Sequence, residues 1–149
     1  GKSIFEVVSM KEYRVGDVMT EHAITVKTSC DIRTAAHLFL RYRISGVPVV
    51  NSRNQLVGVI TLDDVIAAVN FRAGDNVVPL HSVFRELEHR KVSALMRKDF
   101  VTVTRRTTIE RAFRLAVRHN ISTIPVMERK ALIGIIGMRD ILNICLNES

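Results

Sequence analysis

The sequence contains the same pattern twice, and this internal repeat limits the fold more than any other feature. VGVITLDDV at 57–65 and IGIIGMRDI at 133–141 share a glycine, an apolar run and an aspartate at matching positions. Farther upstream, VGDVMT from Val15 aligns with VSALMR from Val92, and ISGVPVV aligns with ISTIPVM. The chain is therefore expected to hold two similar units, residues 15–70 and 92–146, joined by a packed linker at 71–91.

Each unit alternates short apolar runs with one helical pattern. A run at 24–26 or 101–103 comes first, and apolar residues then recur at i, i+3, i+4 and i+7, which indicates a helix with one buried side. These residues are Ile32, Ala35, Ala36 and Phe39 in the first unit, and Ile109, Ala112, Phe113 and Ala116 in the second. Asp31 and Thr108 precede the two helices as expected N-caps.

Two apolar strands and a final helix complete each unit. The strands are expected at 47–50 and 56–61, joined by the polar turn NSRNQ, and again at 124–127 and 132–136. The last helix is expected at 62–70 and at 138–146, and SVFRELEHR in the linker favours a further helix. The order β-α-β-β-α, written twice, predicts the α/β (α+β) class, with the two units packed together to cover their sheets.

Composition narrows the class of protein. No apolar run approaches the roughly 20 residues that span a bilayer, so we expect no membrane segment. Cys30 and Cys145 are far apart and neither belongs to a CxxC pair, which favours free thiols and a cytoplasmic location. The formal net charge is +7, which favours an anionic partner such as a nucleotide, a nucleic acid or an acidic protein surface.

The sequence lacks the usual motifs of catalysis. Its five histidines show no HxxxH or HExxH spacing, and no GxSxG, P-loop or CxxC motif occurs. We therefore expect no catalytic residues, no metal site and no enzyme activity.

These residues resemble the CBS domain family, and the whole chain is similar to a tandem CBS pair, or Bateman module. The resemblance is carried by Met19-Thr20, by the I-S-x-h-P-V segments around Pro48 and Pro125, and by the G-h-h-T-x-x-D stretch from Gly58 to Asp64. It implies two repeats packed about a pseudo-twofold axis. It also implies a regulatory module that binds AMP, ADP, ATP or an adenosyl compound in two clefts, each mixing residues of both repeats.

The resemblance assigns residues to the first cleft. Asp64 would accept hydrogen bonds from the two ribose hydroxyls, with the Thr61 hydroxyl nearby. Other members come from the second repeat: Met96, Phe100 and Val101 around the adenine, and Ile121, Ser122 and Thr123 facing the sugar and phosphate. A helix cap for Asp64, with Thr61 as a strand end, and plain core packing for the apolar residues remain alternatives.

The second cleft is centred on Asp140, and the resemblance adds residues of the first repeat: Ala23, Ile24, Ile44, Ser45 and Gly46. Gly137 stands where the first copy has Thr61, so this cleft lacks one hydroxyl. A lost hydrogen bond costs about 0.5–1.5 kcal/mol, up to about tenfold in affinity. The Asp64 cleft is thus expected to bind more strongly.

Neither cleft carries the His or Arg that often precedes the Pro segment in family members that hold phosphate tightly. The candidate cations for a di- or triphosphate are Arg97, Lys98, Arg118 and Arg139, although the pattern favours a solvated surface charge for each of them. An adenosyl compound with an uncharged tail therefore stays open.

The expected partners follow from the leading interpretation. A sensing module would form a homodimer and regulate a fused or separate effector protein. The alternative is a protein- or nucleic-acid-interaction module with vestigial clefts and a basic binding surface, and a purely structural dimerisation unit is a third interpretation.

Overall fold

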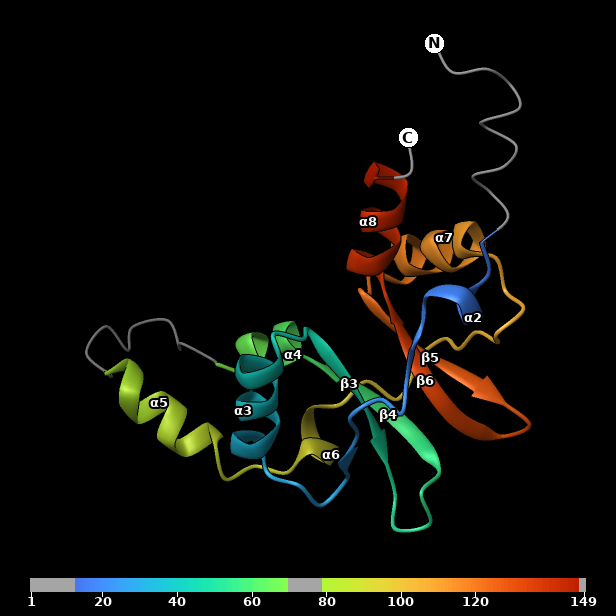
Figure 1. The fold of residues 1–149 in the computed structure, drawn as a ribbon. Coiled ribbons are helices and arrows are strands. Elements are labelled where there is room, and N and C mark those ends of the chain that lie inside the picture. The colour runs from blue at the N-terminus through green and yellow to red at the C-terminus, as the bar shows by residue number, and fades with distance from the viewer. Residues whose placement is uncertain (1–12, 70–78, 148–149) are drawn as a thin grey trace. The chain divides into compact units, whose positions relative to one another are not determined.

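The computed structural model describes residues 13–69 and 79–147, which form two compact units (Figure 1). The first-repeat unit comprises residues 24–69 and 79–99, and the second-repeat unit comprises residues 13–23 and 100–147. Each unit combines helices with a three-stranded sheet, which confirms the α/β (α+β) class. The stretch that leads into each repeat belongs to the unit of the other. We call residues 13–23 the first entrance segment and residues 91–99 the second entrance segment.

The first-repeat unit follows the predicted order β-α-β-β-α. Its elements are β2 (Val26–Lys27), α3 (Ile32–Tyr42), β3 (Gly46–Val50), β4 (Leu56–Thr61) and α4 (Leu62–Ala68), followed by α5 (Leu80–Leu87) and α6 (Val92–Leu95). The sheet order is β2-β3-β4, with β2 parallel and β4 antiparallel to β3. The last predicted helix residue, Asn70, lies outside the described residues.

The second-repeat unit repeats this plan. Its elements are α2 (Val15–Val18), β1 (Thr20–Glu21), α7 (Ile109–His119), β5 (Thr123–Glu128), β6 (Ala131–Gly137) and α8 (Met138–Asn147). The sheet order is β1-β6-β5. The strand expected at 101–103 is reduced to an isolated parallel bridge between Val103 and Val126.

The predicted helix caps and apolar stripes are confirmed. Asp31 accepts a hydrogen bond from the Thr34 N–H at 2.9 Å, and Thr108 accepts one from the Arg111 N–H at 3.1 Å. The Thr34 bonds, backbone first, lower the pKa of the Asp31 carboxyl below its usual value. Each helix buries its predicted side in one of two separate cores. The members are Ile32, Ala35 and Phe39 with Val47, Val49 and Ile60, and Ile109, Ala112 and Ala116 with Ile124, Val126 and Ile136.

The two hairpins close differently, which accounts for the change of alignment between the repeats. Residues 51–55 form the longer turn, in which the Asn51 side chain accepts N–H bonds from Arg53 and Gln55. In the second hairpin only Arg129 and Lys130 separate β5 from β6, with φ of 50° and 68°. Two-residue hairpin turns require such positive φ values.

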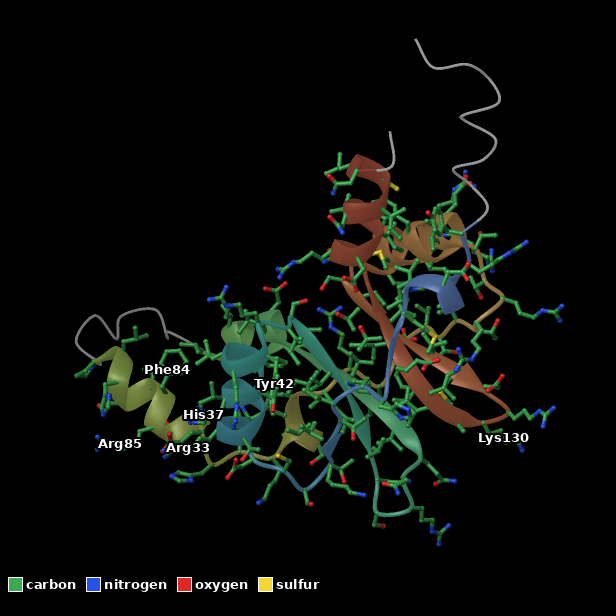
Figure 2. All side chains as sticks on the ribbon, in the orientation of Figure 1. Arg33, His37, Tyr42, Phe84, Arg85 and Lys130 are labelled. Atoms are coloured by element: carbon green, nitrogen blue, oxygen red, sulfur yellow. The ribbon has the colours of Figure 1, made fainter. Side chains whose placement is uncertain are left out.

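The described part of the linker packs on the first repeat. Of the predicted linker 71–91, residues 71–78 lie outside the described residues, and α5 provides the helix expected there. Its buried Leu87 joins the core, and the Arg33 N–H donates to the Glu88 carbonyl at 3.1 Å. A cavity of about 520 Å³ lies between α3 and α5, with Arg33 and His37 on one side and Phe84 and Arg85 on the other (Figure 2).

Candidate functional site

The two entrance segments pair with strands of the opposite repeat. Thr20 and Glu21 lie antiparallel to Ile135 and Gly134 of β6. At the equivalent place in the first-repeat unit, the Arg97 N–H donates to the Val59 carbonyl at 2.8 Å, and the Val59 N–H donates to the Arg97 carbonyl at 3.0 Å. Each strand that leads to a predicted site aspartate is therefore in direct contact with the other repeat's entrance segment.

The glycine shared by the two copies makes this contact possible. A Cβ atom on Gly58 would lie 2.7 Å from the Met96 Sδ and 2.9 Å from the Arg97 carbonyl oxygen. On Gly134 it would meet the Thr20 carbonyl oxygen and lie 2.6 Å from the Met19 Cε. Only a residue without a Cβ allows the backbone of the entrance segment to approach so closely.

Asp64 is held by three contacts at the start of α4. Its Oδ2 accepts the Thr61 N–H at 2.9 Å, and its own N–H donates to the Thr61 Oγ1 at 3.1 Å. Its Oδ1 accepts a hydrogen bond from the Arg97 Nε at 3.0 Å, in an ion pair whose side chains are 15% (Asp64) and 31% (Arg97) exposed. Thr61 and Asp64 thus cap the start of α4, and Arg97 forms an ion pair with the capping aspartate.

The helix cap leaves hydrogen-bond acceptor positions on the Asp64 carboxylate. An ionised carboxylate offers about four acceptor positions, two on each oxygen. In Asp64, the Thr61 N–H and the Arg97 Nε bond one oxygen each. The remaining capacity matches two further donors, which is what the two neighbouring hydroxyls of a ribose would supply. A structural cap and a ligand contact are therefore compatible at this residue.

The segment before each proline lies beside the aspartate of its own repeat. Gly46 stands opposite Thr61 in the sheet, and the Leu62 N–H donates to the Ser45 carbonyl at 2.8 Å. The hairpin of β3 and β4 produces this contact, because the start of one strand must face the end of the other. The assignment of Ser45 and Gly46 to the Asp140 cleft stays a prediction.

The hydroxyl missing from Gly137 reappears on the neighbouring strand. Thr123 stands opposite Gly137, just as Gly46 stands opposite Thr61. Each repeat thus has one threonine and one glycine at this pair of positions. The threonine lies on the second strand of the hairpin, β4, in the first repeat, and on the first strand, β5, in the second repeat. Both threonines are buried, at 6% exposed. Because the second site retains a hydroxyl close by, the Thr-to-Gly change is not by itself a loss of one polar group.

The surroundings of Asp140 differ from those of Asp64 in charge. Asp140 is exposed, and within the described ranges no cation pairs with its carboxylate. Thr20 occupies the position equivalent to Arg97. The neighbouring Glu21 pairs instead with Arg105 at 2.9 Å. The alignment alone could have indicated this asymmetry, but the Arg97–Asp64 contact needed the structure.

Family comparison agrees with this doubled architecture. The profile of the CBS domain matches residues 15–70 and 92–147, which is more than half of the chain. The chain belongs to the CBS domain family. Solved structures similar to it include CBS domain proteins and a CBS domain pair, and this likeness shows the CBS fold.

Three related proteins illustrate the range of CBS relatives. An uncharacterised protein of Methanocaldococcus jannaschii, MJ1232, is 30% identical over 95% of this chain, which covers 42% of that protein. The structure of CBSX2 in complex with AMP is 28% identical, with a TM-score of 0.70 over 90% of this chain and 96% of CBSX2. The CBS pair of MJ0100, solved with 5′-methylthioadenosine and S-adenosyl-L-methionine, is 21% identical, with a TM-score of 0.74 over 91% of this chain and 98% of that one.

The other residues assigned to CBS clefts divide between the two units. Met96 lies with Asp64 in the first-repeat unit, together with the half-buried Ile24 and Ile44. The second-repeat unit holds Asp140 together with Ala23, Phe100, Val101, Ile121, Ser122 and Thr123. Of the four candidate cations, Lys98, Arg118 and Arg139 are exposed, whereas Arg97 is half-buried against Asp64.

The described part of the chain offers neither a metal-binding cluster nor a helix that could span a membrane. No group of three or more His, Cys, Asp or Glu residues within 13–69 and 79–147 is placed to hold a metal ion. None of the helices in those ranges combines the length and the apolar character needed to cross a bilayer.

The cap at Thr61 leads to a stability prediction for the first CBS repeat. Thr61→Val removes the hydroxyl but keeps the shape, so the Asp64 N–H loses its acceptor. The free energy of unfolding should fall by about 1 kcal/mol, the usual cost of losing an N-cap. Thr61→Ser keeps the oxygen and is the matched control. Urea unfolding followed by circular dichroism measures both, and equal stability of the two variants would contradict the capping role.

Proposed function

We propose that this CBS pair is a non-enzymatic regulatory module that binds adenine nucleotides or adenosyl compounds at two sites, centred on Asp64 and Asp140. The observation that carries the proposal is the Asp64 carboxylate, which is largely buried yet retains acceptor capacity for two more donors. A ribose diol supplies two donors on adjacent carbons. The AMP complex of CBSX2, which is 28% identical, supports an adenosine ligand.

The proposed contacts follow the structure and the CBS resemblance together. At the Asp64 site, Thr61, Ser45, Gly46 and Arg97 would surround the ribose, and Met96 would lie towards the base. At the Asp140 site, Ser122, Thr123 and Thr20 occupy the corresponding places. The residues that the resemblance assigns to each site remain part of the proposal: Phe100, Val101, Ile121, Ser122 and Thr123 for the first site, and Ala23, Ile24, Ile44, Ser45 and Gly46 for the second.

A ligand at Asp64 would act directly on the connection between the two units. Arg97 contacts Asp64 and lies in the second entrance segment, close to the point where the chain passes from one unit to the other at Asp99 and Phe100. A ribose sharing Asp64 with Arg97 would change the energy of this contact. If two arrangements of the units differ at this contact, the ligand shifts the balance between them.

The regulated protein is proposed to be a fused or separate effector. The chain spans 42% or less of the first curated relatives it matches, which leaves room in such proteins for another domain. A homodimer is the proposed assembly, because apolar side chains stand exposed on helices of both units. They are Leu40, Ile66, Val117, Leu142 and Leu146.

A cytoplasmic location is proposed from the cysteines. Cys30 and Cys145 are both free thiols. Burial raises the pKa of the Cys30 thiol, so that it behaves as a small apolar side chain rather than as a reactive thiolate. Free thiols persist in reducing compartments.

Ligand binding should be visible as stabilisation of the unmodified chain. AMP, ADP, ATP, 5′-methylthioadenosine and S-adenosylmethionine are each titrated in a thermal unfolding assay, with GMP as the control for the base. A ligand present at 100 times its Kd should stabilise the fold by about 2.7 kcal/mol. Calorimetry then gives the stoichiometry, and AMP is expected to fill the Asp64 site first. No stabilisation by any adenosine compound would contradict the proposal.

A second candidate function has one observation in its favour. Three arginines, Arg111, Arg114 and Arg118, stand exposed along one side of α7. Such a basic stripe could bind nucleic acid. A nucleic-acid contact of this kind weakens steeply as salt is raised, because bound counterions are released. The same chain should then bind an oligonucleotide in low salt and show no stoichiometric nucleotide binding.

A further inference from the structure

Arg97 lies close enough to Asp64 for its guanidinium to interact with a charged group of a ligand bound there. Its backbone is fixed to β4 by two hydrogen bonds with Val59, at 2.8 and 3.0 Å. Its Nε lies 3.0 Å from the Asp64 Oδ1. Any ribose held by Asp64 would therefore lie next to a guanidinium whose position is set by the sheet.

A guanidinium can serve two anions at once. It carries five N–H donors in a planar fork and stays charged at all physiological pH values. The Arg97 side chain is 31% exposed, so a ligand can reach it while the carboxylate remains partly shielded from water. Partial shielding strengthens the attraction between a fixed cation and a phosphate.

Among the described residues, no cation forms an ion pair with Asp140 at the second site. The residue equivalent to Arg97 is Thr20, which is neutral, and the adjacent Glu21 is already paired with Arg105. Arg139 directly precedes Asp140 and is exposed, and none of the ion pairs among the described residues joins the two. At the Asp64 site the remaining nearby charges, Asp63, Lys98 and Asp99, are all exposed. The described contacts of the two aspartates therefore differ in the ion pair between Arg97 and Asp64.

We infer that Arg97 is the specificity-determining residue of the Asp64 site. It selects ribonucleotides that carry negative charge on the ribose, such as a 5′-phosphate, over neutral or cationic adenosyl compounds. The Asp140 site, with Thr20 in its place, does not make this selection. The inference rests on the proposed function and assigns a ligand class to each site.

The test uses the full chain with one site removed at a time. Asp140→Asn leaves the Asp64 site, and Asp64→Asn leaves the Asp140 site. Each chain is titrated by calorimetry with AMP and with 5′-methylthioadenosine, which share the adenosine and differ in charge. The Asp64 site should favour AMP by about tenfold or more, the value of one charge-assisted hydrogen bond, and the Asp140 site by less than about threefold.

Exchanging the residues at the equivalent positions 97 and 20 shows whether Arg97 causes the preference for AMP over 5′-methylthioadenosine. Arg97→Thr in the Asp140→Asn chain should remove the preference for AMP, whereas Arg97→Lys should keep part of it. Thr20→Arg in the Asp64→Asn chain should create a preference for AMP. Added salt should weaken the preference wherever the arginine is present. Continued binding of 5′-methylthioadenosine identifies variants that have kept their fold.

The possible failures are distinguishable. An equal AMP preference at the two sites, or a preference that survives Arg97→Thr, would overturn the role of Arg97 and leave the proposed function intact. Absence of binding by both ligands in the unmodified chain would overturn the proposed function and this inference with it.

Discussion

Asp64→Asn is expected to weaken AMP binding at the Asp64 site by about 100-fold or more. The two ribose hydroxyls would each donate to the carboxylate, and a hydrogen bond to a charged group contributes about 1.5–3 kcal/mol. Even the lower value, counted twice, amounts to about 100-fold in Kd. Asparagine is preferable to alanine because its amide oxygen can still accept the Thr61 N–H that Asp64 now accepts at 2.9 Å.

Calorimetry on the Asp140→Asn chain, which retains a single site, measures this loss directly. Asp63→Asn is the matched control, because it removes the same charge from the adjacent, exposed position. The control should bind AMP like the parent chain. If the Asp63 and Asp64 variants weakened AMP binding equally, the effect would come from the loss of one negative charge near the site, and Asp64 would not be a ribose ligand.

Gly134→Ala is expected to lower the free energy of unfolding by about 1–3 kcal/mol, as extra atoms in a tightly packed place usually do. The new Cβ would meet the carbonyl oxygen of Thr20 and the Met19 Cε. A carbonyl in a paired strand cannot rotate away, so β1 would have to separate from β6. The measurement is urea unfolding of the two proteins at the same pH.

Gly58→Ala provides the comparison within the same chain. There the nearest atom is the Met96 Sδ at 2.7 Å, which belongs to a flexible side chain, and the Arg97 carbonyl follows at 2.9 Å. The loss should be smaller than at Gly134. A larger decrease in the free energy of unfolding for Gly58→Ala would mean that contacts with side chains, and not with the backbone of the entrance segment, determine the cost of adding a Cβ at these glycines.

Local periodicity was sufficient to predict most of the secondary structure. The stripe at Ile32, Ala35 and Phe39 is buried as expected, and Asp31 and Thr108 cap their helices. These features depend on residues a few positions apart, so a sequence reports them directly. The strand at 101–103 was the exception, because only Val103 finds a partner, in β5.

Contacts between distant segments were decided by the tertiary structure. Thr61 and Asp64 were predicted as site residues, but their pairing with Arg97 depends on the second entrance segment lying along β4. The position of Gly46 opposite Thr61 likewise follows from the hairpin of β3 and β4. Sequence spacing carries no information about which strand an incoming segment will join.

By itself, the sequence determined that this protein consists of two CBS repeats with an aspartate shortly after the last strand of each, because repetition and periodicity are properties of the chain. Only the tertiary structure decided that the last strand of each repeat pairs with the entrance segment of the other repeat. It also decided that a glycine in that strand allows the two backbones to approach closely. The physical reason is backbone pairing across distant residues. That pairing places the Arg97 guanidinium on Asp64, whereas the equivalent position in the other entrance segment holds the neutral Thr20.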